Sequence, residues 1–149
     1  MTPTRDNTIL GLGCDMLRIE RIARLGRRSG HLVLDLMLAP AERRALAGYG
    51  DSAADWPGCA PRIAALVSAK EAFFKALGTG LVQPLRWVDV AMTRTRSTFD
   101  LQGAAAAAFA ALAGVVCHLT ICSDTIFVLS TVIILGRPIR GQTPSTGDQ

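Results

Sequence analysis

The chain is poor in lysine, in aromatic residues and in long apolar runs. Of its 149 residues only 5% are aromatic, and lysine occurs only as Lys70 and Lys75, so almost all of the positive charge is arginine. A membrane span needs ~18 or more consecutive apolar residues. The apolar run 104–117 is shorter, and polar residues separate it from the run 126–135. We therefore expect a soluble protein with no membrane partner.

The four cysteines lack the C-x-x-C and C-x-H spacings of zinc sites. Residues 1–7 lack the pattern of a signal peptide, so we expect reduced thiols that fill core space and a cytoplasmic location. The net charge of +4 and the isoelectric point near 9.2 suggest an acidic partner. Because no basic tail and no aromatic–basic interleaving accompany this charge, nucleic acid is not expected to be that partner.

Half of the residues are hydrophobic and 19% are charged, which suits one globular domain and excludes a disordered chain or a fibre. We expect a domain over residues 8–135, an N-terminal extension at 1–7 and a disordered polar tail at 136–149. Sequence periodicity predicts strands at 8–14, 86–92, 98–101, 115–122 and 126–135, and helices at 16–28, 40–48, 62–77 and 102–113. The last two strands form a predicted hairpin. Because these elements do not alternate as βαβ units, the predicted class is α+β.

A carboxylate stands where the first predicted strand is followed by a helix. The preceding Gly11-Leu-Gly13 resembles the start of a dinucleotide fingerprint, but Met16 occupies the third glycine position, so a Rossmann site is not predicted. Asp15 at such a junction either faces a ligand or caps the following helix. These residues alone leave both possibilities open.

A second feature is the run KEAFFKALGTG at 70–80. Glu71 and Lys75 lie four residues apart on one face of the predicted helix, and a surface ion pair is the simplest interpretation. A ligand site is the alternative, because both lysines lie in this segment and a compact ammonium can meet a phosphate as a point charge. The turn at 78–80 either ends the helix or offers backbone N–H groups and a hydroxyl to a phosphate oxygen.

Together these two features resemble a known family. The pattern G-x-G-x-D at 11–15, followed 56 residues after the aspartate by Glu71 within K-E-A-x-x-K-A-x-G-T-G, is similar to the signature of the holo-[acyl-carrier-protein] synthases, which are small 4′-phosphopantetheinyl transferases. The agreement extends to I-E-R-I at 19–22, L-A-P-A-E at 38–42, W-V-D-V at 87–90 and H-L-T-I-C-S at 118–123. The resemblance covers residues 9 to about 135.

The resemblance implies a small mixed or antiparallel sheet packed on a long central helix. It also implies an enzyme that transfers 4′-phosphopantetheine from coenzyme A to a serine of an apo acyl carrier protein and releases adenosine 3′,5′-bisphosphate. Asp15 and Glu71 would hold Mg²⁺, an ion that takes one or two carboxylates plus substrate phosphates. Either Glu71 or a metal-held water near it would accept the serine proton. Lys75 would join these two carboxylates as a catalytic residue, and the residues implied to contact coenzyme A are Lys75, Gly78, Thr79, Gly80 and Lys70.

The resemblance also gives the first helix a role, because arginines there dock the acidic carrier protein in this family. Arg21 and Arg28 match the docking positions, seven residues apart and so on one helical face, with Arg24 between them. A solvated face is the alternative for any single exposed arginine. The family also implies a homotrimer with active sites at subunit boundaries, which would cover sheet edges and apolar surface.

Two departures from the family pattern concern coenzyme A binding. Leu66 stands where the family has an arginine, and Ser123 stands where its last motif has a histidine. We therefore expect a divergent member, serving either fatty acid synthesis or a dedicated carrier protein of polyketide or specialised lipid synthesis. The rival interpretation is a non-catalytic homologue that only binds carrier proteins. Retention of Asp15, Glu71 and Lys75 argues against it.

Overall fold

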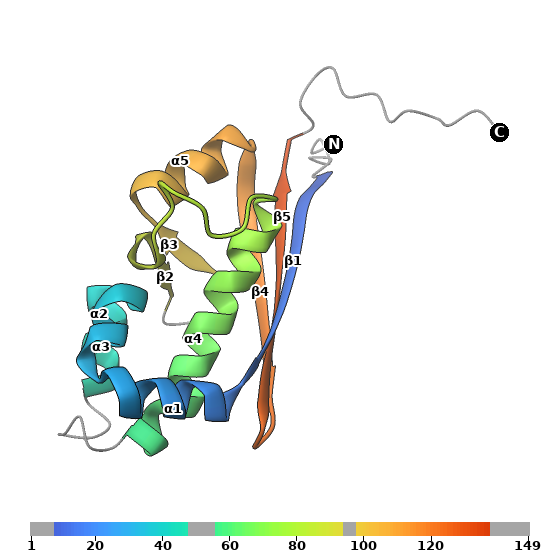
Figure 1. The fold of residues 1–149 in the computed structure, drawn as a ribbon. Coiled ribbons are helices and arrows are strands. Elements are labelled where there is room, and N and C mark those ends of the chain that lie inside the picture. The colour runs from blue at the N-terminus through green and yellow to red at the C-terminus, as the bar shows by residue number, and fades with distance from the viewer. Residues whose placement is uncertain (1–7, 48–55, 94–97, 138–149) are drawn as a thin grey trace.

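A three-stranded antiparallel sheet and one long helix organise the chain (Figure 1). The computed structural model describes residues 8–47, 56–93 and 98–137. The strands are β1 (Thr8–Arg18), β2 (Val90–Met92), β3 (Phe99–Leu101), β4 (Gly114–Ser123) and β5 (Phe127–Gly136). The helices are α1 (Ile19–Ser29), α2 (His31–Met37), α3 (Pro40–Ala47), α4 (Trp56–Ala76) and α5 (Gly103–Ala111), with a short 3₁₀ turn at Trp87–Asp89.

The sheet has the order β1-β5-β4, and β2 pairs with β3 in a separate two-stranded sheet. All of these pairings are antiparallel, so the α+β class is confirmed and the sheet is antiparallel rather than mixed. The predicted hairpin is formed by β4 and β5. The extension predicted at 1–7 and most of the predicted tail, 138–149, lie outside the described residues.

Several predicted boundaries are wrong because packing overrides local signals. β1 does not end at residue 14, since its pairing with β5 continues to Arg18 opposite Phe127. α4 begins at Trp56, six residues before the predicted start at residue 62, and Ala60 in this added part of the helix is almost fully buried. The sequence analysis missed α2 and predicted a strand where the 3₁₀ turn lies.

The thiols were predicted to fill core space, and this holds for one of the four. Cys117 is buried, and burial raises the pKa of its thiol to about 12. Cys14 and Cys122 are exposed, and Cys59 is partly exposed. The prediction is therefore wrong for Cys14 and Cys122, because both side chains lie on a sheet face that no helix of the described residues covers.

The backbone of α4 packs directly against β1. A Cβ atom added to Gly11 would lie 1.9 Å from the main-chain oxygen of Ala76, and one added to Gly13 would lie 1.9 Å from that of Ala72. Only glycine leaves room for such an approach. The G-x-G pattern therefore lets the helix touch the strand, and it brings Asp15, two residues further along β1, beside α4.

The two faces of the sheet differ in what covers them. In Figure 1, α4 lies across one face, and no described element lies on the other. Leu12 and Met16 of β1 are each 64% exposed on that open face, where Met16 is opposite Leu129 of β5. Apolar side chains so exposed on a sheet mark a surface that suits a partner. Within the described part of the chain, no helix has the length and apolar character to cross a membrane.

We predict that Gly13→Ala lowers the free energy of unfolding by roughly 1–3 kcal/mol, because the added methyl group forces β1 away from α4. Urea unfolding of the variant and the original chain measures the difference. Adding Ala72→Gly to the variant should not restore the lost free energy of unfolding, since the atom that obstructs the new methyl group is a main-chain oxygen. Recovery of stability in that double variant would contradict this account of the contact.

Candidate active site

Two carboxylates meet where β1 passes α4. Asp15 lies on the face of β1 that α4 covers, and its side chain is 15% exposed. Glu71 lies on α4, and its pKa is raised, first by burial and then by the negative charge of Asp15. A carboxylate affects the pKa of another in this way only when the two are close. The structure thus brings together the two predicted acids, one from each element.

Asp15 does not cap the following helix. The N-cap residue of α1 is Arg18, and no side chain makes a capping hydrogen bond there. Asp15 instead lies within β1, three residues earlier, because the strand continues past it. Of the two interpretations left open by the sequence, the capping one is wrong.

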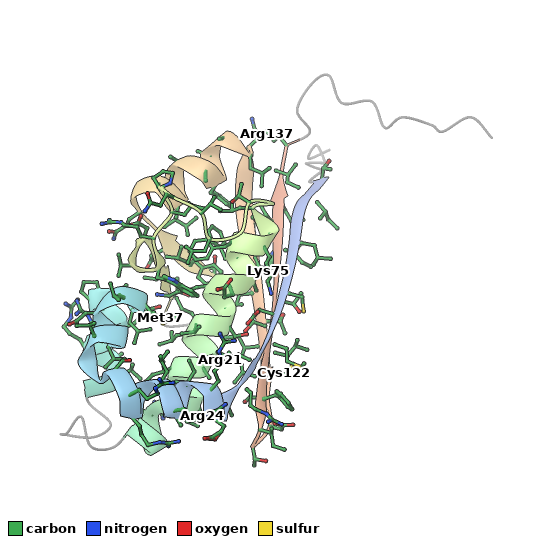
Figure 2. The ribbon with its side chains drawn as sticks, in the orientation of Figure 1. Arg21, Arg24, Met37, Lys75, Cys122 and Arg137 are labelled. Carbon is green, nitrogen blue, oxygen red and sulfur yellow. The ribbon has the colours of Figure 1, made fainter. Side chains whose placement is uncertain are left out.

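The Lys75 ammonium bridges α4 to β1. Its Nζ donates to Asp15 Oδ1 at 2.8 Å and to the main-chain oxygen of Cys14 at 3.1 Å. The ion pair along the helix, one of the two interpretations that the sequence left open, is therefore corrected: the partner of Lys75 is Asp15. The charge of Lys75 also lowers the pKa of Glu71. The Lys75 side chain is 47% exposed, so the ammonium is accessible from solvent (Figure 2).

The donor set fits a hard cation with few protein ligands. Asp15 and Glu71 supply only carboxylate oxygens, and among residues 8–47, 56–93 and 98–137 no group of three or more His, Cys, Asp or Glu residues forms a metal cage. Zinc sites ordinarily use nitrogen or sulfur ligands, three or four from the protein. Mg²⁺ instead accepts one or two carboxylates and completes its shell with water and substrate phosphate. The pair therefore fits Mg²⁺.

Lys70 has a structural position. Its side chain is fully buried, and its Nζ donates to Glu42 Oε2 at 2.6 Å and to the main-chain oxygens of Met37 and Trp87 at 2.9 and 3.1 Å. An ammonium has three donors, and all three are used. Glu42 in turn accepts from the N–H groups of Ala39 and Met92. The structure therefore corrects the predicted contact of Lys70 with coenzyme A. Lys70 instead joins α2, α3 and the 3₁₀ turn to α4.

The glycine turn after α4 closes the helix. The N–H of Gly78 donates to the oxygen of Lys75, and that of Gly80 donates to the oxygen of Phe74. Both glycines have positive φ, 81° and 65°, which ends the helix without strain. These two N–H groups are thus not available to a phosphate, which corrects that part of the prediction. Thr79 is exposed, and its hydroxyl donates to the oxygen of Gly80.

The predicted docking arginines on α1 are all exposed, but their surroundings differ. Arg21 lies close enough to Glu71 to lower the pKa of that carboxyl. Arg24 is 3.7 Å from Glu20, which also accepts a hydrogen bond from Arg27 at 3.2 Å. Glu20 therefore offsets part of the positive charge of Arg24 and Arg27. Arg21 instead lies near the carboxylates as well as on the surface.

The two departures from the family pattern lie in different environments. Leu66 is 7% exposed and packs in a core cluster with Leu17 and Ile22, so an arginine at this position would bury its charge. The leucine that replaces the family's arginine is thus part of the hydrophobic core of this chain. Ser123 is exposed at the end of β4.

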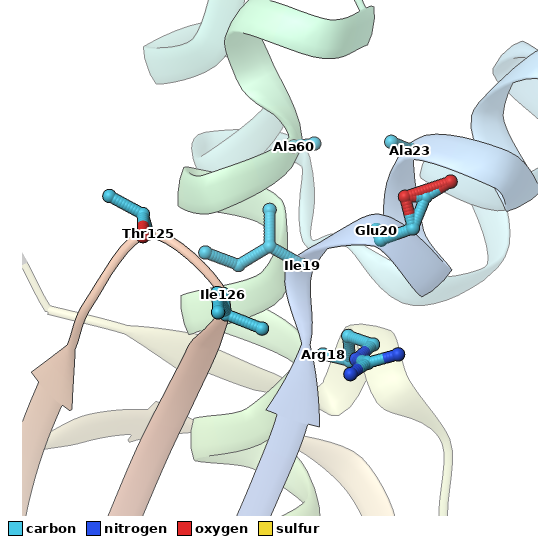
Figure 3. Close-up of a pocket in the computed structure, with 7 residues that line it drawn as sticks. All are labelled: Arg18, Ile19, Glu20, Ala23, Ala60, Thr125 and Ile126. Carbon is cyan, nitrogen blue, oxygen red and sulfur yellow. The ribbon is translucent and has the colours of Figure 1, made fainter.

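A shallow depression lies near the start of α1, away from the carboxylates (Figure 3). It lies between the start of α1, the first turns of α4 and the β4–β5 turn. Asp15, Glu71 and Lys75 are not among its lining residues, so we do not place the chemistry there. The lining residues are Arg18, Ile19, Glu20, Ala23, Ala60, Thr125 and Ile126.

The sequence analysis missed Ser68, which supports the site from α4. Its hydroxyl is fully buried and donates to the main-chain oxygen of Asp15 at 3.2 Å. Ser68 lies three residues before Glu71, and this helical spacing places the two residues on neighbouring positions of one face. The spacing was a usable signal, but the partner atom on β1 was not visible in the sequence.

The sequence is similar to those of known proteins. Residues 11–114 match the model of the 4′-phosphopantetheinyl transferase superfamily. A holo-[acyl-carrier-protein] synthase of Rhizobium rhizogenes is 35% identical over 140 residues, covering 89% of this chain and 99% of that protein. Another, of Acidithiobacillus ferrooxidans, is 38% identical over 82 residues, covering 55% of this chain and 59% of that protein.

The fold also matches solved structures. The Helicobacter pylori holo-[acyl-carrier-protein] synthase in complex with coenzyme A superposes with a TM-score of 0.63 at 22% identity. The match covers 83% of this chain and 98% of that one. Family model, relatives and fold agree with one another. The chain therefore belongs to the 4′-phosphopantetheinyl transferase superfamily and is an enzyme of its holo-[acyl-carrier-protein] synthase type.

Proposed function

We propose that this enzyme transfers 4′-phosphopantetheine from coenzyme A to a serine of an apo acyl carrier protein, with Mg²⁺, and releases adenosine 3′,5′-bisphosphate. The observation that carries the proposal is the partly buried pair Asp15 and Glu71 beside the accessible ammonium of Lys75. The names of the relatives and the coenzyme A complex of the Helicobacter pylori protein support the same substrates.

In the proposed reaction, the two carboxylates and Lys75 have different roles. The serine oxygen forms a bond to the phosphorus that carries pantetheine, and the bond from that phosphorus to the bridging oxygen of the leaving bisphosphate breaks. Asp15 and Glu71 would hold Mg²⁺, which when bound offsets negative charge on the pyrophosphate. Lys75 presents a cation to a phosphate oxygen.

The serine proton needs an acceptor near the carboxylates. Glu71, or a water next to it, takes that proton. Burial and the charge of Asp15 raise the pKa of Glu71, and a carboxylate with a raised pKa is a stronger base than an ordinary one. Arg21 and Lys75 oppose that shift, so these two cations favour the ionised form of Glu71 that can act.

A non-catalytic carrier-binding protein is the second candidate, and the site argues against it. Two carboxylates placed close together and partly out of water repel each other, and binding a carrier protein on α1 gives no reason to keep them so. An assay distinguishes the candidates. The chain is incubated with coenzyme A, Mg²⁺ and an apo carrier protein, and a mass gain of one phosphopantetheine on the carrier marks catalysis.

In that assay we predict that Asp15→Ala and Glu71→Ala each lower turnover more than about 100-fold. The reason is that changes to residues around metal ligands already reduce metal affinity or activity about 10–100-fold, and these variants remove a ligand itself. Asp100→Ala, which removes an exposed carboxylate on β3, is the matched control and should retain turnover. Near-normal turnover of a folded Asp15→Ala or Glu71→Ala would refute the assignment of that residue.

Docking of the acidic carrier protein is proposed for the arginines of α1. Arg21, Arg24 and Arg28 are exposed, and Figure 2 shows Arg21 and Arg24 on this helix. Charge complementarity of this kind increases the rate of encounter and fixes orientation. A carrier bound there would approach the carboxylates from the side of Arg21, which influences Glu71.

We predict that Arg21→Glu combined with Arg28→Glu raises the KM for the carrier protein far more than the KM for coenzyme A. Because Arg21 also acts on Glu71, Arg28→Glu alone is the cleaner test and should raise the carrier KM without a comparable fall in kcat. Arg44→Glu, which alters an exposed arginine on α3, is the control. Equal effects on both substrates would contradict docking on α1.

Trimer formation through the open face of the sheet is the last part of the proposal. Leu12 and Met16, with Leu129 beside them, present apolar side chains where no described element covers the sheet. Closed cyclic assembly would bury this face in every subunit. Active sites would then lie near subunit boundaries, because Asp15 is on the same edge strand as these residues.

Light scattering should give a particle of three times the 15.8 kDa chain mass. Met16→Asp should shift this particle towards the monomer, because a charge would enter an apolar contact. The matched control is Leu32→Asp, which changes a similarly exposed leucine on α2 and should leave the particle mass unchanged. A monomeric original chain would refute the trimer.

A further inference from the structure

One buried hydroxyl stands apart from the other polar groups of the described residues. Ser130 Oγ is the only buried side-chain nitrogen or oxygen atom in these parts of the chain that has no hydrogen-bond partner. The side chain is fully buried, on a face of β5 that is otherwise apolar, with Val128 and Val132 on either side. Buried hydroxyls without a partner are unfavourable and rare, so the position needs an explanation.

The register of the sheet places this hydroxyl next to Asp15. Ser130 is directly opposite Asp15 in the pairing of β1 with β5, so both side chains point to the face that α4 covers. Side chains in such pairs have Cβ atoms about 4.5–5.5 Å apart, within reach of a hydroxyl and a carboxylate. On the other side Ser130 is opposite Ile121 of β4, which offers no polar side chain.

The hydrogen bonds of Asp15 leave a role for a second donor. Its Oδ1 accepts from Lys75, and its main-chain oxygen accepts from Ser68. In the reaction proposed above, Lys75 turns to a phosphate oxygen, and the Asp15 carboxylate then loses the donor that orients it. Carboxylates that bind a metal are ordinarily held by a further hydrogen bond from the protein.

We propose that Ser130 is a positioning residue for Asp15: its hydroxyl donates to the Asp15 carboxylate when metal and coenzyme A are bound, and so fixes the orientation of this ligand. The inference rests on the proposed function, because it takes Asp15 as a metal ligand and Lys75 as a phosphate contact. In the free protein the Ser130 hydroxyl has no partner, and its contribution begins only when the ligands bind.

This assignment predicts that loss of the Ser130 hydroxyl weakens metal binding but does not lower the stability of the free protein. Ser130→Ala removes a hydroxyl without a partner, so the melting temperature of the free protein stays unchanged or rises. Ser68→Ala is the matched control, because it removes the other fully buried serine hydroxyl, which does have a partner, and it should lower the melting temperature. A merely structural Ser130 would behave like Ser68.

The test uses the full chain with coenzyme A and Mn²⁺, whose free concentration is read by electron paramagnetic resonance. We expect Ser130→Ala to weaken Mn²⁺ binding about tenfold, a typical effect of losing a hydrogen bond to a metal ligand. The Mg²⁺ concentration that gives half-maximal transfer should rise by a similar factor. Unchanged Mn²⁺ affinity, or a fall in melting temperature like that of Ser68→Ala, would overturn the inference.

Asp15→Asn separates this inference from the proposed function. If Asp15→Asn loses Mn²⁺ binding while Ser130→Ala keeps it, Asp15 remains a metal ligand and only the role of Ser130 is overturned. If the folded Asp15→Asn variant binds Mn²⁺ like the original chain, the metal assignment itself fails, and the role of Ser130 fails with it.

Discussion

The contact between the backbone of β1 and the backbone of α4 is the constraint on which the site depends. Gly11 and Gly13 leave no side chain between strand and helix, so the main-chain oxygens of Ala72 and Ala76 occupy the space where Cβ atoms would otherwise be. The position of α4 relative to β1 is thereby fixed at the backbone and does not depend on side-chain rotamers. Side chains on the two elements near this contact, such as Asp15 and Glu71, are therefore held in well-defined relative positions, which the proposed metal site requires.

The two lysines of the chain illustrate two uses of an ammonium group in one helix. Lys70 is fully buried, and its three donors tie α4 to segments that precede and follow it. Breaking such a buried pair leaves a charge without compensation, so Lys70 and Glu42 depend on each other. Lys75 is half exposed and holds Asp15 by one ion pair, which a phosphate can replace. One lysine therefore holds the helix in the fold, and the other lies at the surface beside Asp15.

Local patterns predicted much of the fold, and the family resemblance implied the pairing of Asp15 with Glu71, whereas long-range packing decided the rest. The sequence contained a signal about Lys70 that was not used: residues five apart on a helix lie about 140° apart around its axis, so Lys70 and Lys75 cannot share a face. The close approach at Gly13 and the position of Ser130 opposite Asp15 had no such signal. Both depend on which distant element lies beside β1, and in the sheet that contains β1 only the β4–β5 pairing is local in sequence.

The strand order has a consequence for how the protein folds during its synthesis on the ribosome. Among the described strands, β1 pairs only with β5, so residues near position 8 bond with residues near position 136. The edge that carries Asp15 therefore has no strand partner until almost the whole described chain has been synthesised. Contacts so distant in sequence slow folding and leave a strand edge open to wrong pairing in the meantime. Nascent chains of this enzyme should thus complete the pairing of β1, which carries Asp15, only after β5 has left the ribosome.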